Sequence, residues 1–136
     1  MREVGRLSGR FGERPSGIGI WVTVRCFYDR FELFDLALKT VELEGLNLEF
    51  GCGWKAESIN YLAEKLDGTV HGFDALEGLP EAWFANQPKG TFGSDRRLPE
   101  VRENVALHIG WFKDTLPEFV AKNEGPVAFL HIDCDL

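Results

Sequence analysis

Apolar residues early in the chain recur at the spacing of a helix. Steps of four, three, four and three residues place five of them on one helical stripe. The stripe consists of Phe27, Phe31, Phe34, Leu38 and Val41. We expect this helix to end near Gly45, because glycine readily adopts the left-handed conformation at a helix C-terminus. The residues before the stripe are rich in glycine and arginine and lack periodicity, so residues 1–20 are expected to form a flexible tail.

Four later segments have the composition of β-strands, namely residues 46–50, 69–74, 104–110 and 127–133. The last is almost continuously apolar, which is typical of a strand buried on both faces. An amphipathic helix that includes Ile59 and Leu66 is predicted between the first two strands. A second helix, from Asp114 as its N-cap to Lys122, is predicted before the last strand.

This alternation of strands and helices is typical of an α/β fold with a parallel sheet. Right-handed crossovers favour the strand order 3-2-1-4, that of a Rossmann-like sheet preceded by an N-terminal helix. Residues 21–136 are expected to form a single α/β domain of the methyltransferase type, its N-terminal cofactor-binding portion. The sheet is expected to be incomplete, because further strands normally follow the fourth.

Acidic residues stand at three of the predicted strand ends. Glu49 ends the first strand, Asp74 ends the second, and Asp133 and Asp135 follow the fourth. Ligands of such sheets bind at the carboxyl ends of the strands, where the strand order reverses. These acids are therefore expected to lie around one binding site.

A glycine loop follows Glu49 directly. Gly51-Cys52-Gly53 can turn sharply and let a ligand approach the backbone, and the next helix presents free N–H groups to it. Residues 51–56 also match the G-x-G-x-x-A pattern of dinucleotide sites, which alone is a weak signal. Glu49 would repel a pyrophosphate and attract an ammonium or sulfonium, so the loop favours S-adenosylmethionine. Ser58 either points into this loop or caps the helix.

Two further residues are candidates for holding an adenosine. Asp74 lies 21 residues past Gly53, near the separation at which a strand-2 acid meets ribose hydroxyls. The alternative is a solvated aspartate at a strand end, and the glycine loop favours the ribose role. Trp111 follows Gly110 at the end of the third strand and is the best candidate for stacking on adenine, although tryptophan near a sheet is more often core.

Asp133 and Asp135 lie on the same side of the chain if the fourth strand stays extended. Two carboxylates can hold Mg²⁺, which normally keeps several waters. An acidic strand end without metal accounts for the spacing equally well. His131 shares their parity, but a histidine inside an apolar strand is more often a hydrogen-bonded core residue. His71 and His108 are interpreted in the same way.

The composition of the chain limits the classes of partner that it is expected to bind. The net charge of −7 makes nucleic acid an unfavourable partner. No apolar run approaches the roughly 20 residues that span a bilayer, so no membrane partner is expected. The three cysteines are far apart and lack C-x-x-C spacing, which indicates a reducing, cytoplasmic compartment.

Several segments together resemble the motifs of class I S-adenosylmethionine-dependent methyltransferases of the macrocin O-methyltransferase-like group. They are Leu48-Glu49-Phe50-Gly51, Trp54 to Ala63, His71 to Asp74, Glu77 to Pro80, Gly110 to Phe112, Asp114 to Pro117, and Leu130 to Leu136. The resemblance covers about residues 28–136. It implies methyl transfer from S-adenosylmethionine, typically to a hydroxyl of a small-molecule acceptor, and a chain that is C-terminally truncated relative to the group.

The resemblance also implies roles for individual residues. Glu49, Gly51 and Gly53 would contact the methionine end of the cofactor, and Asp74 would bind the ribose. In metal-dependent relatives an aspartate at the end of strand 4 holds Mg²⁺ and helps to activate the acceptor hydroxyl. Asp133 matches that position, and it is the expected catalytic residue.

Two other hypotheses remain open from the residues. The first is a nicotinamide-dinucleotide-binding Rossmann protein, which the glycine pattern and Asp74 support and Glu49 opposes. The second is a non-catalytic fragment that needs a partner to cover the fourth strand, either another protein or a second copy in a homo-oligomer. An unpaired strand edge readily associates with another chain.

Overall fold

The computed structural model describes residues 27, 29–84 and 86–134. The expected flexible tail of residues 1–20 and the candidate ligand Asp135 lie outside this range. The helices are α1 (Arg30–Leu38), α2 (Glu57–Lys65) and α3 (Phe112–Lys122). The strands are β1 (Leu46–Phe50), β2 (Val70–Asp74), β3 (Val105–Ile109) and β4 (Val127–Ile132). Among the helices of the described residues, none is long and apolar enough to cross a membrane.

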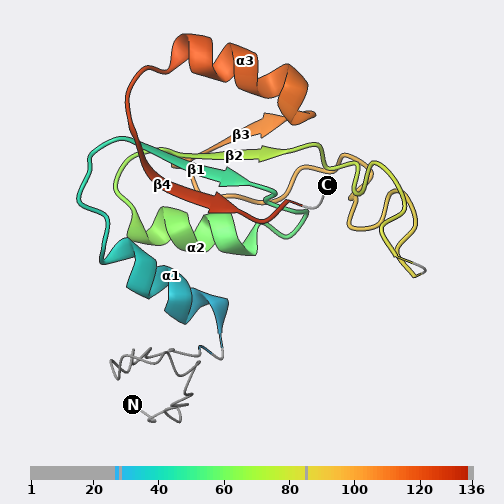
Figure 1. Ribbon diagram of the computed structural model, residues 1–136, viewed down its shortest axis with the longest axis horizontal. Coiled ribbons are helices and arrows are strands. Elements are labelled where there is room, and N and C mark those ends of the chain that lie inside the picture. The colour runs from blue at the N-terminus through green and yellow to red at the C-terminus, as the bar shows by residue number, and fades with distance from the viewer. Residues whose placement is uncertain (1–26, 28, 85, 135–136) are drawn as a thin grey trace, which may run out of the picture.

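The four strands form one parallel sheet in the order β3-β2-β1-β4. The sequence predicted this order, and the structure confirms it at the level of an α/β fold with a parallel sheet. Because β1 lies between β2 and β4, Glu49 is aligned with Gly72 on one side and with His131 on the other. The carboxyl ends of all four strands therefore meet at one edge of the sheet (Figure 1).

Helices cover both faces of the sheet. α1 and α2 lie on one face and α3 lies on the other (Figure 1). Alternate residues of β1 divide between the two layers, as the pleat of a strand requires. Leu48 packs with Phe73 and Phe119 on the α3 side. Glu49, on the opposite side, faces Ser58 of α2.

The predicted apolar stripe is confirmed in part, because Phe27 and Val41 lie outside the helix, and the predicted helix end is wrong. Phe34 is buried beside Leu62 and Phe129, and the stripe residues Phe31, Leu38 and Val41 pack against the same cluster. The helix begins after Asp29, which accepts the Phe31 N–H at 3.0 Å. It ends at Leu38.

Gly45 is not the C-cap that the sequence predicted, because it lies beyond the end of the helix. It lies beside the segment that leads into β4. A side chain at Gly45 would overlap the backbone of Pro126. The glycine therefore allows close approach of two segments, a contact that only the tertiary fold reveals.

Two further local predictions are wrong. Helix α3 begins at Phe112, and its N-cap is Trp111, three residues before the predicted cap; Asp114 lies inside the first turn. There a carboxylate still stabilises the positive end of the helix. Strand β4, which lies at the edge of the described sheet, is not buried on both faces. Leu130 is 44% exposed and Ile132 is 60% exposed.

Candidate functional site

A cavity of about 500 Å³ lies at the carboxyl ends of the strands. Its walls come from the loop between β1 and α2, the end of β2 with the segment that follows, the start of α3, and the residues after β4. Small-molecule sites commonly measure about 300–1,000 Å³. The cavity is therefore large enough for a ligand of nucleoside size, and it lies where open α/β sheets bind ligands.

Most of the residues that the sequence nominated meet at this cavity. Its lining includes the predicted residues Gly51, Cys52, Gly53, Ser58, Asp74, Trp111 and Asp133. Glu49 is nominated too but does not line the cavity, since its side chain is fully buried behind the wall. Topology brings these residues together from four separate parts of the chain.

Gly51 turns the chain where β1 ends. Its φ of +88° is in the left-handed region, and an added Cβ would overlap the carbonyl oxygen of Asp133. Its N–H donates to the carbonyl of Phe73 at 2.9 Å. Only glycine combines this conformation with so close an approach to the residues after β4.

Asp74 holds the glycine loop in place. One carboxylate oxygen accepts the Gly53 N–H at 2.8 Å, and the other accepts the Leu76 N–H at 2.6 Å. Each carboxylate oxygen has more than one lone pair, so Asp74 keeps acceptor capacity on the cavity side. The residue therefore organises two loops in addition to any role toward a ligand.

Glu49 lies directly behind Ser58. The Ser58 hydroxyl donates to Oε1 of Glu49, and Ser58 itself lines the cavity. The second oxygen, Oε2, is buried and has no hydrogen-bond partner within the part of the chain that the structure describes. A buried carboxylate with a free oxygen favours a cation or a hydrogen-bond donor nearby.

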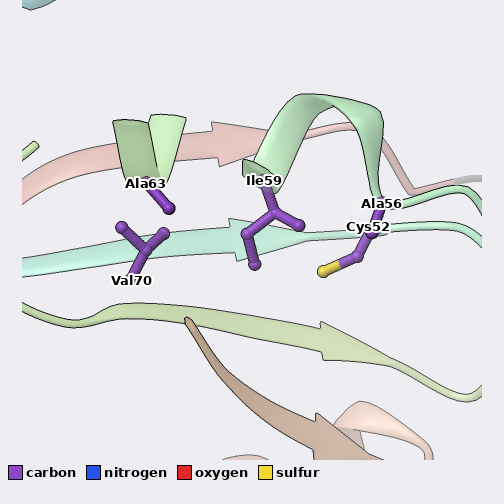
Figure 2. Close-up of a cluster of buried hydrophobic side chains, with 5 residues drawn as sticks. All are labelled: Cys52, Ala56, Ile59, Ala63 and Val70. Atoms are coloured by element: carbon purple, nitrogen blue, oxygen red, sulfur yellow. The ribbon is translucent and has the colours of Figure 1, made fainter. Parts of the chain in front are cut away.

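The side chain of Cys52 belongs to the core (Figure 2). It packs with Ala56, Ile59, Ala63 and Val70, and its Sγ lies 4.0 Å from the carbonyl oxygen of Phe73. Burial raises the pKa of the Cys52 thiol far above its ordinary value, and the negative charges of Glu49 and Asp74 raise it further. Cys52 is therefore a neutral, structural thiol.

The N-terminus of α2 opens toward the same cavity. Ala56, its N-cap, is fully buried with a φ of +49° and makes no side-chain capping bond. The N–H groups of a first helical turn lack partners within the helix. Those of α2 therefore add hydrogen-bond donors and positive potential to the cavity wall, where Glu57 and Ser58 lie.

Arg30 and Phe92 are among the lining residues that sequence reasoning did not single out as site residues. Arg30 of α1 reaches the cavity and pairs with Glu57 at 2.7 Å, across 27 residues of sequence. Phe92 lines the cavity from the long segment after β2 and is 52% exposed. The glycines, prolines and aromatic residues of that segment marked it as a loop, but no local signal indicated that it turns back to the site.

Of the two predicted metal ligands, Asp133 lies in the described part of the chain and Asp135 does not. Asp133 is exposed and lines the cavity, and its N–H donates to the carbonyl of Phe50 at 2.8 Å. The described part of the chain contains no group of three or more histidine, cysteine, aspartate or glutamate side chains placed to hold a metal ion. Trp111 also lines the cavity, directly before α3.

No protein-family model, no curated protein and no solved structure matches this chain.

Proposed function

We propose that this chain binds S-adenosylmethionine in the cavity and serves methyl transfer to a hydroxyl of a small molecule. The observation that carries the proposal is the buried Glu49 carboxylate behind the glycine loop, with Ser58 between it and the cavity. The cofactor has an ammonium and a sulfonium, so a buried negative charge near the loop attracts it. Attraction is stronger here than in water because the surroundings are less polarisable.

Other lining residues match other parts of the cofactor. Asp74 has free lone pairs for ribose hydroxyls, and Trp111 offers an aromatic face for adenine. The free N–H groups at the start of α2 suit the methionine carboxylate. Arg30 lies at this end as well, although Glu57 already pairs with it. The proposal thus assigns each cofactor group a complementary partner.

When bound, S-adenosylmethionine supplies a methyl group activated by the sulfonium charge. The chain's own contribution is to position the acceptor and to receive a proton. Asp133 lines the cavity, and we assign to its carboxylate the proton that the acceptor hydroxyl loses. No step of this proposal involves Mg²⁺.

A dinucleotide is the alternative ligand, because residues 51–56 match its loop pattern. The buried charge of Glu49 opposes it, since a pyrophosphate at this loop would face that carboxylate. The ammonium of Lys55 does little to offset the negative charge of Glu49, because it lies 4.0 Å from the carboxylate of Glu57 and pairs with it. The structure therefore supports the cationic cofactor better than the anionic one.

Calorimetric titration of the purified chain tests the proposal. We expect S-adenosylmethionine and S-adenosylhomocysteine to bind and NADH to give no heat. Glu49→Gln should weaken S-adenosylhomocysteine by about tenfold or more, the loss of one charge-assisted interaction. The exposed Glu44→Gln is the matched control and should leave binding unchanged. Binding of NADH alone would favour the dinucleotide hypothesis, and a folded sample that binds none of them would reject cofactor binding.

We also propose that a second copy of the chain covers β4 in a homo-oligomer. Leu130 and Ile132 of this edge strand expose apolar side chains. Sedimentation should then show a dimer or larger assembly that Ile132→Lys disrupts. A wild-type chain that sediments as a monomer over the accessible concentration range would reject this.

A further inference from the structure

His131 of β4 lies next to Glu49 of β1 in the sheet register. Its Nδ1 atom is 3.4 Å from Oε1 of Glu49. Glu49 is fully buried, and the side chain of His131 is 19% exposed. Among the described residues, neither Nδ1 of His131 nor Oε2 of Glu49 has a hydrogen-bond partner, and both atoms are buried. A buried ring nitrogen without a partner therefore lies close to a carboxylate that has acceptor capacity left.

The surroundings limit what else these groups can use. Phe34 of α1 meets the imidazole edge to face, with the ring centroids 4.7 Å apart. Ser58 of α2 already bonds Oε1, and the nearby thiol of Cys52 is directed to backbone carbonyls. A buried polar atom without a partner costs about 1–3 kcal/mol. A small side-chain rotation that lets Nδ1 of His131 bond Oε1 of Glu49 would remove this cost for Nδ1.

The direction of this hydrogen bond depends on the tautomer of His131. An ionised carboxylate only accepts, whereas Nδ1 of histidine donates in one tautomer and accepts in the other. If Nδ1 donates, the carboxylate is held as an acceptor on that side. The Ser58 hydroxyl must then donate to the carboxylate as well, and only its lone pairs remain for the cavity.

We propose that His131 is a positioning residue of the site: its Nδ1–H donates to Glu49 and holds the carboxylate where the Ser58 hydroxyl donates to it, so that Ser58 presents only its lone pairs to the cavity. A cavity wall that offers a hydrogen-bond acceptor favours a ligand group that donates a hydrogen bond, such as an ammonium. The identity of that ligand rests on the proposed function, but the direction of the hydrogen bonds does not. His131 acts through Glu49 and Ser58 and does not line the cavity itself.

Nitrogen NMR of the imidazoles tests the direction of the bond without any ligand. In the full-length chain labelled with ¹⁵N at histidine, His131 should show a protonated Nδ1. The signal is assigned by its loss in His131→Phe. A neutral His131 that carries its proton only on Nε2 would overturn the proposal, because Nδ1 could then only accept.

Two variants separate the hydrogen bond from the packing. His131→Asn retains a side-chain N–H near the position of Nδ1 but loses the ring that contacts Phe34. His131→Phe retains a ring but loses the donor. Binding should follow the donor, so His131→Phe weakens S-adenosylhomocysteine by about tenfold, whereas His131→Asn retains most of the affinity. Stability should follow the ring and fall more in His131→Asn.

Methylthioadenosine is the control ligand, because it has the adenosine but no amino-acid part. We expect His131→Phe to bind it as the wild-type chain does, since the effect concerns the ammonium alone. Equal weakening of both ligands, or affinities that follow stability in the two variants, would show a merely structural role and overturn the proposal. If the wild-type chain binds neither ligand, the proposed function fails, and the NMR result still decides whether His131 donates to Glu49.

Discussion

Asp74 and Gly53 are joined by a hydrogen bond of 2.8 Å between a carboxylate oxygen and a backbone N–H, across 21 residues of sequence. This bond connects the end of β2 to the loop that follows β1. Asp74 was predicted as a ribose ligand from its distance in sequence to the glycine loop. Its carboxylate also holds that loop in place. An aspartate at this position has a structural role that a ligand-based argument alone would overlook.

Replacement of Asp74 by asparagine should loosen the loop. The amide presents only one acceptor oxygen, so one of the N–H groups of Gly53 and Leu76 loses its partner. We expect a loss of about 1–2 kcal/mol in the free energy of unfolding. Urea denaturation measures it, and the exposed Asp67→Asn is the matched control, with a change within about 0.5 kcal/mol. Equal effects in the two variants would contradict the structural role.

Gly51 and Gly53 should respond very differently to alanine. Both have a positive φ, but only at Gly51 would an added Cβ overlap a backbone atom, the carbonyl oxygen of Asp133. At Gly53 nothing lies within 4 Å of that position. We expect Gly53→Ala to lower the free energy of unfolding by about 1 kcal/mol, because alanine disfavours the left-handed conformation. Gly51→Ala should lower it by about 3 kcal/mol or more, because the overlap is added. Similar midpoints in thermal unfolding would show that β4 does not pack on this loop as described.

Acid should destabilise the chain through a histidine pair on the α3 side of the sheet. Nδ1 of His71 lies 3.1 Å from Nε2 of His108, and His108 stacks on Phe73. Burial lowers the pKa of both histidines below the ordinary value of 6.5, and for His71 the neighbouring His108 lowers the pKa further. The unfolded chain therefore binds more protons, so stability is retained above pH 6.5 and falls as the pH drops below it.

Urea denaturation between pH 7.5 and 5.5 checks this dependence on pH. His108→Gln keeps a polar group near Nε2 but does not titrate, so its stability should depend less steeply on pH. Glu118 of α3 opposes the lowered pKa of His108, since its negative charge favours the protonated ring. Glu118→Gln should consequently make the fall steeper. A His108→Gln variant with an unchanged pH profile would contradict the assignment to this pair.

Cys52 should be unreactive in the folded chain. Its pKa is raised by burial, and the thiolate is the form that attacks a disulfide reagent. In a background with Cys26→Ser and Cys134→Ser, an aromatic disulfide reagent should label Cys52 slowly in buffer and quickly in urea. Cys134 is exposed and, left as the sole cysteine, should react readily in buffer. Rapid labelling of Cys52 in buffer would show that its thiol is open to the cavity.

The strands and their order could be predicted because local pattern and chain topology suffice for them. Short apolar runs define β1, β2, β3 and β4, and the handedness of crossovers leaves the observed order. The glycine loop and the acids at Asp74 and Asp133 were placed at the same edge for the same reason. Helix ends could not be predicted as well, since the caps at Trp111 and Lys39 depend on how each helix meets its neighbours.

The sequence by itself determined an α/β chain whose glycine loop and strand-end acids gather at one edge, since these follow from periodicity and connectivity. Only the tertiary structure decided how each acid is used. Glu49 and Asp74 are both strand-end carboxylates in the sequence, yet one is fully buried behind Ser58 and the other holds two backbone N–H groups. Burial and hydrogen-bond partners come from segments distant in the chain, and no local pattern encodes them.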